Sequence, residues 1–233
     1  MITVSLVTHG HGNMVSNLVE QLRTFSSVRQ IILTVNIAES LEHKCDDLVQ
    51  VIQNSQPIGF GANHNNAFYF CNQQYFCVLN PDIVFLEDPF PYLLNCLQQF
   101  NIALAAPIIL SSSGDIEDSA RKFPTFYSLL KKFLFSIDGK WPLEHDKNIN
   151  YPDWVAGMFM LFDSKKFNDI KGFDTRYFLY YEDVDICRRI KLAGYSLGLC
   201  IQAKVIHNAR RTSRKNIKYM FWHIRSIFRF LFL

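Results

Sequence analysis

Apolar residues recur in short runs along the first third of the chain, and polar residues or glycine follow each run. The pattern predicts buried strands at Ile2 to Thr8, Gln30 to Val35, Leu48 to Ile52 and Tyr75 to Leu79. After the first strand, apolar residues at helical spacing predict an amphipathic helix from about Met14 to Phe25. Short strands that alternate with helices are typical of an α/β fold with a mostly parallel sheet.

A second informative stretch runs from Trp154 to Tyr195. The apolar run from Val155 to Phe162, interrupted only by Gly157, predicts one further buried strand. A short Lys-rich helix and a Gly-Phe-Asp turn are expected next. The segment FLYYEDVDICRRIKLAGY then predicts a helix that begins near Glu182 and ends at Gly194.

Carboxylates crowd the first turn of this helix, at Glu182, Asp183 and Asp185. The helix macrodipole favours ionised acids there, so we expect such an acid to stay deprotonated and to serve as a base near neutral pH. At about 100° per residue, two positions that lie two apart point to nearly opposite sides of a helix. One of the two aspartates should therefore face a cleft, and the other should cap the helix or pair with Arg188 or Arg189. The alternative is that all of these acids only cap the helix.

Polar side chains stand at the ends of three predicted strands. Thr8 ends the first, and Asn36 and Asn54 follow the next two. Ligands of open α/β sheets bind beyond the carboxyl ends of strands, so these residues are expected on one rim. His9 and His11 beside them are interpreted as exposed turn residues, with a metal pair as the alternative.

The fourth strand leads directly into Asn80-Pro81-Asp82. Proline fixes an extended turn where the strand ends, so Asp82 is held outward at the ligand edge, where its oxygens suit a hard divalent cation. An ordinary turn aspartate is the alternative. Upstream, Gly59 and Gly61 allow close backbone approach, but GxGxxG and GxxxxGK[ST] are absent from the sequence, which argues against a dinucleotide fold and a P-loop.

Composition narrows the class of protein further. A chain of 233 residues suits one large domain, and a net charge of +3 is too small for general nucleic-acid binding. Six cysteines without metal-ligand spacing are interpreted as reduced core residues of a cytosolic protein. The N-terminal MITVSLVTHG reads as a strand rather than a signal peptide, and no apolar run reaches membrane-spanning length without charge.

Several motifs occur together in one order: GFGANHNNAF, CVLNPDI, EDSARKFPT, DWVAGMFMLF, GFDTRYFLYYEDVDICRRIKLAGY and VIHNARRTS. This series closely resembles the family 2 glycosyltransferases, and within them the bacterial rhamnosyltransferase-like branch. The resemblance implies the GT-A fold, an α/β Rossmann-like architecture whose mixed, mostly parallel central sheet is flanked by helices. It also implies a nucleotide-sugar donor, Mg²⁺ or Mn²⁺ and inversion at the anomeric carbon. We expect one catalytic domain over residues 1–209 and a separate helical tail over 210–233.

The resemblance also assigns roles. Asp183 matches the general base, and Asn80 with Asp82 takes the place of the DxD motif, with Asp82 as metal or diphosphate contact. Because an amide oxygen is a weaker ligand than a carboxylate, Asn80 lowers the expected metal affinity. His207 is a further metal candidate, with a buried structural role as its alternative. Arg211 and Ser213, in the stretch after it, match the diphosphate-contacting segment.

The remaining candidates surround these residues. Trp154, Gly157 and Glu182 are assigned to the acceptor or sugar, with core packing as the alternative for Trp154. Around Asn36 the familiar VDNxS is written VNIAES, so base selectivity cannot be carried over. The donor-binding candidates are completed by a set spread over the chain: Thr8, Asn36, Gly61, Asn63 and Arg121.

The C-terminal segment from Asn216 to Leu233 predicts a basic amphipathic helix. Such a helix can lie on an anionic membrane surface, which would suit a lipid-linked acceptor, and it is too charged to span a bilayer. Packing on the domain or in a homodimer is the alternative. The basic residues Lys218, Arg225 and Arg229 fall on another side from the apolar ones: Ile217, Met220, Phe221, Ile224, Ile227, Phe228 and Leu231.

These observations predict an inverting, metal-dependent glycosyltransferase of the cytoplasm or inner membrane face that helps to build a cell-surface polysaccharide or glycolipid. By resemblance, the favoured donor is dTDP-rhamnose and the acceptor is a glycan or a lipid-linked sugar. One alternative is the same fold with another UDP- or GDP-sugar. Another is a degenerate GT-A protein that binds a glycan or a partner without turnover. A nucleotidylyltransferase is disfavoured because HGHGN is a poor triphosphate loop.

Overall fold

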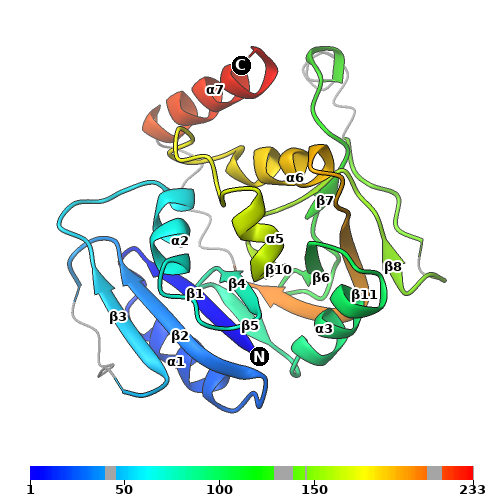
Figure 1. Ribbon diagram of the computed structural model, residues 1–233. Helices are drawn as coiled ribbons and strands as arrows, with labels where there is room; N and C mark the ends of the chain where they lie inside the picture. Colours follow the sequence, from blue (N-terminus) through cyan, green and yellow to red (C-terminus); the bar gives the residue numbers. More distant parts are fainter. Residues whose placement is uncertain (40–45, 129–138, 145, 209–216, 233) are drawn as a thin grey trace.

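The computed structural model describes residues 1–39, 46–128, 139–144, 146–208 and 217–232. A nine-stranded mixed sheet forms the centre, with strand order β3-β2-β1-β4-β10-β6-β11-β5 and β8 paired to β11 (Figure 1). Helices cover both faces of this sheet. The described chain is therefore a layered α/β structure, as the alternation of strands and helices predicts.

The first half of the sheet is parallel. It consists of β1 (Ile2–Thr8), β2 (Val28–Val35), β3 (Val49–Gln53) and β4 (Tyr75–Leu79). Each strand lies within two residues of the predicted position, because β-branched and aromatic residues between polar turns mark both ends. The carboxyl ends of these strands point to one edge.

The second half of the sheet is mixed. β10 (Phe159–Asp163) lies antiparallel to both β4 and β6 (Leu104–Leu110), and β11 (Leu197–His207) is parallel to β6. The short strands β5 (Ile83–Phe85) and β8 (Ile149–Asn150) pair antiparallel to β11.

The prediction of one continuous strand from Val155 to Phe162 is wrong, because the structure has two separate strands in this region. β9 (Trp154–Val155) pairs with β7 (Ala120–Arg121) in a separate small sheet, and β10 begins only at Phe159. Between them the chain turns at Gly157, whose N–H donates to Asp183 at 3.1 Å. A continuous strand would have kept this N–H in the ladder.

Two apolar cores lie on opposite faces of the sheet. Under the first face pack α1 (Asn13–Arg23) and α3 (Phe90–Gln99), through residues such as Leu18 and Leu93. The second face is covered by three helices, α2 (Phe60–Phe68), α5 (Ser164–Asp169) and α6 (Glu182–Leu192). The C-terminal helix α7 (Ile217–Phe232) lies outside these layers, at the top of the molecule near the start of α6 (Figure 1).

Candidate active site

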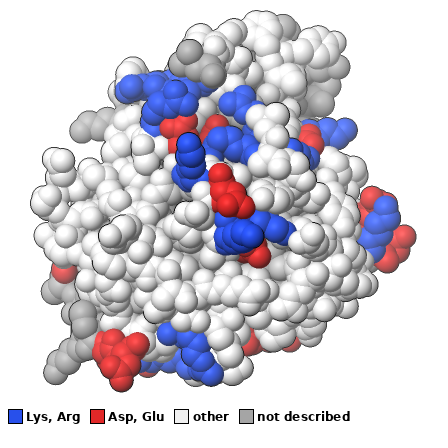
Figure 2. Space-filling view, in the orientation of Figure 1, with Lys and Arg blue, Asp and Glu red and all other residues white. Residues whose placement is uncertain are grey.

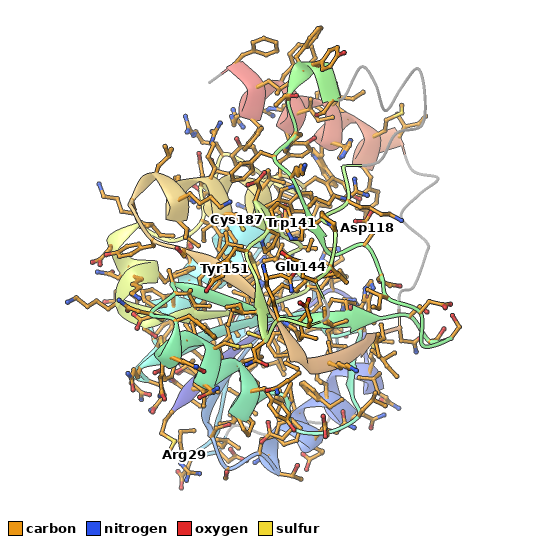
Figure 3. All side chains as sticks on the ribbon, turned by 90° about the vertical axis from the view of Figure 1, so that its right-hand side faces the viewer. Arg29, Asp118, Trp141, Glu144, Tyr151 and Cys187 are labelled. Carbon is orange, nitrogen blue, oxygen red and sulfur yellow. The ribbon has the colours of Figure 1, made fainter. Side chains whose placement is uncertain are left out.

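Two adjoining cavities open near the carboxyl ends of the parallel strands. Their volumes are about 920 Å³ and about 450 Å³. Asp118 and Arg121 line both cavities, so the two spaces share a wall. Figure 3 shows Asp118 in the half of the molecule that carries α7, far from Arg29 at the opposite end.

Buried amides form one wall of the larger cavity. Asn54 Nδ2 donates to Asn36 Oδ1 at 2.8 Å and to Asn63 Oδ1 at 2.7 Å. The Ile58 N–H also donates to Asn36 Oδ1, at 3.0 Å. Of the predicted rim, Asn36 lines the cavity, and Asn54 lies behind it and holds Asn36 and Asn63 in place. Asn63, a separately predicted donor contact, also lines the cavity.

Thr8 does not reach the larger cavity directly, although it was a predicted donor contact. Its side chain is fully buried and donates to Glu39 Oε1 at 2.6 Å. The same carboxylate accepts from the N–H groups of Gly10 and Gly12, each at 2.9 Å. Thr8 and Glu39 thus fix the turn whose two histidines line the cavity. Glu39 has no motif of its own and was missed.

Gly61 is also absent from the residues that line either cavity in the described structure. A Cβ atom at this position would lie 2.6 Å from Phe173 Cβ, closer than real Cβ contacts. The glycine therefore makes room for an aromatic ring rather than for a ligand, and the predicted donor contact is corrected to a packing role.

At the far wall of the larger cavity, Asp82 meets the end of β11. Its Oδ2 atom lies 3.2 Å from His207 Nε2, and His207 Nδ1 lies 2.8 Å from Glu117 Oε2. Burial works against the charged imidazole, but the hydrogen bonds to both carboxylates outweigh it and raise the pKa of His207. Asp82 Oδ1 is buried and has no hydrogen-bond partner among the described residues.

These groups fit a divalent cation in part. In the described ranges, no three His, Cys, Asp or Glu side chains gather as a ready set of metal ligands. Asp82 would supply an oxygen ligand, and a cation would satisfy its unpartnered Oδ1 atom. His207 would supply a nitrogen ligand when the cation displaces the proton from Nε2. Asn80 lines the same cavity. Glu117 also lines this cavity and contacts the other ring nitrogen of His207, as a carboxylate that orients a metal-binding histidine does. The contact between Glu117 and His207 joins residues 90 positions apart and was not predicted.

Asp183 lines the smaller cavity from the first turn of α6. Its Oδ2 accepts from the Gly157 N–H at 3.1 Å, and its Oδ1 accepts from the Val184 N–H at 2.9 Å. Burial nevertheless raises the pKa of Asp183, since the loss of water outweighs the backbone hydrogen bonds. The macrodipole is therefore not the dominant influence on this group, and the raised pKa makes this carboxylate a stronger base when it is ionised.

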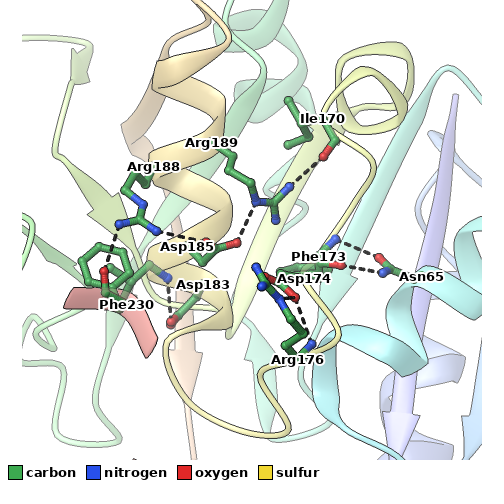
Figure 4. Close-up of polar contacts among 11 residues, drawn as sticks. Asn65, Ile170, Phe173, Asp174, Arg176, Asp183, Asp185, Arg188, Arg189 and Phe230 are labelled. Carbon is green, nitrogen blue, oxygen red and sulfur yellow. Dashed lines mark hydrogen bonds and ion pairs between the residues drawn. The ribbon is translucent and has the colours of Figure 1, made fainter. Parts of the chain in front are cut away.

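The second aspartate of the motif faces away, as predicted. Asp185 Oδ2 accepts from Arg189 Nε at 2.7 Å, and Asp185 Oδ1 lies 3.6 Å from Arg188 (Figure 4). Asp185 is buried, so these ion pairs tie the first turn of α6 to its own later turns. Asp183 therefore lines the smaller cavity, whereas Asp185 stabilises the helix that carries both acids.

Glu182 lines the smaller cavity but is buried at 5% exposure. Its Oε2 atom lacks a hydrogen-bond partner within the part of the chain that the structure describes. Burial, with a further contribution from the charge of Asp183, raises the pKa of Glu182 well above its ordinary value.

Of the other predicted sugar contacts, Trp154 lines this cavity, whereas Gly157 lines neither cavity in the described structure and is corrected to a packing role. Trp154 donates from Nε1 to the Lys122 carbonyl at 3.0 Å, which fixes the ring. Gly157 lies behind Asp183: a Cβ here would be 3.5 Å from Asp183 Cβ. At the shared wall, Arg121 pairs with Asp118. Asp118 Oδ1 is buried without a partner in the described residues, and Asp118 was not among the predicted site residues.

The loop before α6 adopts an unusual backbone. Tyr180 and Tyr181 both have positive φ, at 70° and 68°, and both line the smaller cavity. Two consecutive bulky residues in the left-handed region are costly, about 1–2 kcal/mol each relative to a right-handed backbone. They place the two rings at the cavity immediately before Glu182 and Asp183.

The helix α7 completes both cavities. Tyr219 and Trp222 line the larger one, and His223 lines the smaller one. One face of α7 therefore packs on the domain, which was the alternative to a membrane-surface helix. That residues of α7 line both cavities was not predicted from the sequence. Two predicted diphosphate contacts, Arg211 and Ser213, lie outside the described residues.

Solved structures with the same arrangement are glycosyltransferases. The structure of GalNAc-T7 with UDP, GalNAc and Mn²⁺ superposes with a TM-score of 0.71 and 14% identity, over 93% of this chain and 44% of that one. The structure of the mannosyltransferase PcManGT from Pyrobaculum calidifontis with GDP-Man and Mn²⁺ superposes with a TM-score of 0.66 and 12% identity, over 96% of this chain and 60% of that one. This chain therefore spans about half the length of these neighbours. The central sheet and its helices form the GT-A fold.

Sequence comparison identifies the family. The profile described as "Glycosyltransferase like family 2" matches residues 27–225. The chain belongs to this family, and it is a glycosyltransferase.

Curated relatives agree with this assignment. The rhamnosyltransferase WbbL of Escherichia coli K12 is 31% identical over 99% of this chain and 92% of its own length. An N-acetylglucosaminyl-diphospho-decaprenol L-rhamnosyltransferase of Mycobacterium tuberculosis is 29% identical, over 66% of this chain and 53% of its length. The hexosyltransferase Agl10 of Haloferax volcanii, named for low-salt glycan biosynthesis, is 23% identical over 89% of this chain.

Proposed function

We propose that this enzyme transfers rhamnose, with inversion, from dTDP-rhamnose to a lipid-linked sugar during synthesis of a cell-surface polysaccharide, on the cytoplasmic side of the membrane. The names of two relatives support the sugar, and the decaprenol-linked name of one supports the acceptor class. The observation that carries the proposal is geometric. Asp82 and Asp183 lie in adjoining cavities, and Asp118 and Arg121 belong to both.

The larger cavity is assigned to the donor. Asn36 and Asn63 line this cavity and are assigned to the nucleoside. Asp82, Asn80 and His207 line it as well and are assigned to the diphosphate. Asp82 and His207 would hold Mg²⁺ or Mn²⁺, which neutralises the charge of a departing diphosphate when it is bound. Arg121 lies at the shared wall, where its guanidinium can contact the donor from the other side.

The smaller cavity is assigned to the acceptor. Asp183 removes the proton from the acceptor hydroxyl as that oxygen forms a bond to the anomeric carbon. The bond from the anomeric carbon to the diphosphate oxygen breaks at the same time, and dTDP leaves with that electron pair. Trp154 offers a ring face to a sugar, and the fixed position of Asp183 against Gly157 keeps the base oriented.

A donor panel tests the proposal. Purified protein is incubated with dTDP-rhamnose, UDP-sugars and GDP-sugars, with and without Mn²⁺, and release of nucleoside diphosphate is measured with and without a lipid-linked acceptor. We expect release from dTDP-rhamnose that increases with acceptor and with Mn²⁺. Turnover of a UDP- or GDP-sugar in its place would overturn the choice of donor. Nucleotide binding without any turnover would overturn the enzyme assignment.

A further inference from the structure

The helix α7 presents one face to the domain. The Trp222 ring lies 4.6 Å from the Phe178 ring, Ser226 Oγ donates to the Leu179 carbonyl at 3.2 Å, and the Phe230 ring centroid lies 4.2 Å from the Arg188 guanidinium. Ser226 and Phe230 are buried at 4% and 5% exposure. This inner face seats the helix on the loop before α6, so the helix is held in a fixed orientation.

The opposite face of α7 is apolar and exposed. Its residues recur three or four positions apart, which places them in one stripe along the helix. Because exposed phenylalanines and aliphatic residues in a continuous stripe are unfavourable in water, such a surface marks an interaction site. Each is between 47% and 77% exposed: Ile217, Met220, Phe221, Ile224, Phe228 and Phe232.

Basic residues border this stripe. At about 100° per residue, Arg225 and Arg229 project to a narrow sector between the apolar face and the inner face. The surrounding sequence has the same sign of charge, because residues 186–233 contain eleven Lys and Arg and no Asp or Glu. Figure 2 shows Lys and Arg side chains below the top of the molecule, interspersed with Asp and Glu side chains.

Two kinds of occupant suit an apolar stripe, and the charge distinguishes them. A second copy of this chain would bring two like-charged borders together, which is unfavourable. An anionic lipid surface instead attracts the arginines while the phenylalanines enter the headgroup region. None of the described helices is both long enough and apolar enough to cross a membrane. The chemistry therefore favours a helix that lies on a bilayer.

We propose that the stripe of α7 docks this enzyme on an anionic membrane surface. The inner face of the same helix lines both cavities through Tyr219, Trp222 and His223, so docking brings the catalytic site to the bilayer. Resting on the proposed function, this arrangement delivers the hydroxyl of a lipid-linked acceptor to the smaller cavity. The docking itself requires no catalytic turnover.

Vesicle co-sedimentation tests the proposal with the full chain. Vesicles of phosphatidylglycerol and phosphatidylcholine are compared with vesicles of phosphatidylcholine alone. The test variant is Phe221→Glu with Phe228→Glu, two exposed stripe residues. The matched control is Tyr69→Glu with Leu86→Glu, which makes the same charge change at residues that are 85% and 63% exposed on other elements.

We expect the wild type and the control variant to bind anionic vesicles, and the stripe variant to bind at least tenfold more weakly. Its circular dichroism and its affinity for dTDP should be unchanged, which would show that it is folded. Equal binding by the stripe variant would overturn the proposal. The proposal would also be overturned if the wild type bound no vesicles and formed a dimer in analytical ultracentrifugation that the stripe variant does not form. Vesicle binding in a protein that fails to use dTDP-rhamnose would overturn the proposed function alone.

Discussion

Asp183 owes its chemistry to opposing influences on one carboxyl group. Two backbone N–H groups stabilise its charge, and burial in the wall of the smaller cavity destabilises it. Burial is the larger effect, so the pKa is raised. A base gains strength as its pKa rises, provided that it is still ionised at the working pH. The same position therefore orients the carboxylate and makes it more basic.

Replacing this base tests its role. We expect Asp183→Asn to lower kcat by roughly 10²–10⁴-fold. The affinity for dTDP, measured by calorimetry, should be unchanged because the donor cavity is intact. The control is Asp185→Asn, two residues away on the scaffold side. This variant should keep transfer activity but lose about 2 kcal/mol of unfolding free energy, because its ion pairs are partly buried. An Asp183→Asn enzyme with normal kcat would contradict the assignment.

The raised pKa of Asp183 also predicts a pH dependence. The base acts only when it is ionised, so activity should fall as the pH is lowered through its pKa. Because that pKa is raised, the acidic limb of kcat/KM should lie above pH 3.8, the ordinary value for aspartic acid. A kcat/KM profile with its acidic limb at or below the ordinary value would show that burial does not control this group.

Glu117 is the residue whose role is most readily separated from catalysis. We expect Glu117→Ala to weaken Mn²⁺ binding roughly 10–100-fold, as measured by electron paramagnetic resonance, because the His207 ring loses the carboxylate that orients it. Glu117→Gln keeps an acceptor oxygen and should recover part of the affinity. Glu87→Ala, at an exposed site, is the control. Unchanged Mn²⁺ affinity in Glu117→Ala would place the metal elsewhere.

Among the secondary-structure elements, α2 shows how packing and binding divide along one helix. Gly61 lies against Phe173 and Asn63 lines the larger cavity, two residues further on. The glycine brings the helix close to the β10–α6 connection, and closeness allows the amide to join the network of Asn36 and Asn54. The element therefore positions a binding residue through a residue that touches no ligand.

The substitution Gly61→Ala tests whether Gly61 acts through packing or through ligand binding. Gly61→Ala should lower the unfolding free energy by about 1–3 kcal/mol, because the added methyl overlaps Phe173. The affinity for dTDP in the folded fraction should be nearly unchanged. Gly139→Ala is the matched control, since a Cβ there meets no described atom within 4 Å, and urea denaturation should show no loss. Loss of dTDP affinity without loss of stability would restore Gly61 as a donor contact.

At the scale of the whole molecule, ligand binding should appear as thermal stability. A ligand at 100 times its dissociation constant stabilises the folded state by about 2.7 kcal/mol. For a chain of this size that is roughly 5–10 °C in Tm. We expect dTDP with Mn²⁺ to produce this shift in the wild type and in Asp183→Asn. Asp82→Asn should lose the part that depends on Mn²⁺. A shift that is independent of Asp82 would remove it from the metal site.

Local patterns in the sequence predicted the four parallel strands and the helices α1 and α6, and they singled out Asp82 and Asp183. Strand ends such as Asn80 and helix starts such as Glu182 are marked by residues close in sequence, so both could be located. The partner of His207 and the shared wall at Asp118 could not, because they depend on how distant strands and loops meet. The break at Gly157 was missed for a similar reason, since it exists to satisfy a side chain 26 residues away.

The left-handed pair Tyr180 and Tyr181 has a consequence for protein engineering. Glycine adopts positive φ without a penalty, so Tyr180→Gly would make this backbone easier to form while removing a ring from the acceptor cavity. Thermal stability would then rise, and discrimination between acceptors would fall. A directed-evolution campaign that selects for thermal survival alone would tend to produce enzymes with a broader range of acceptors.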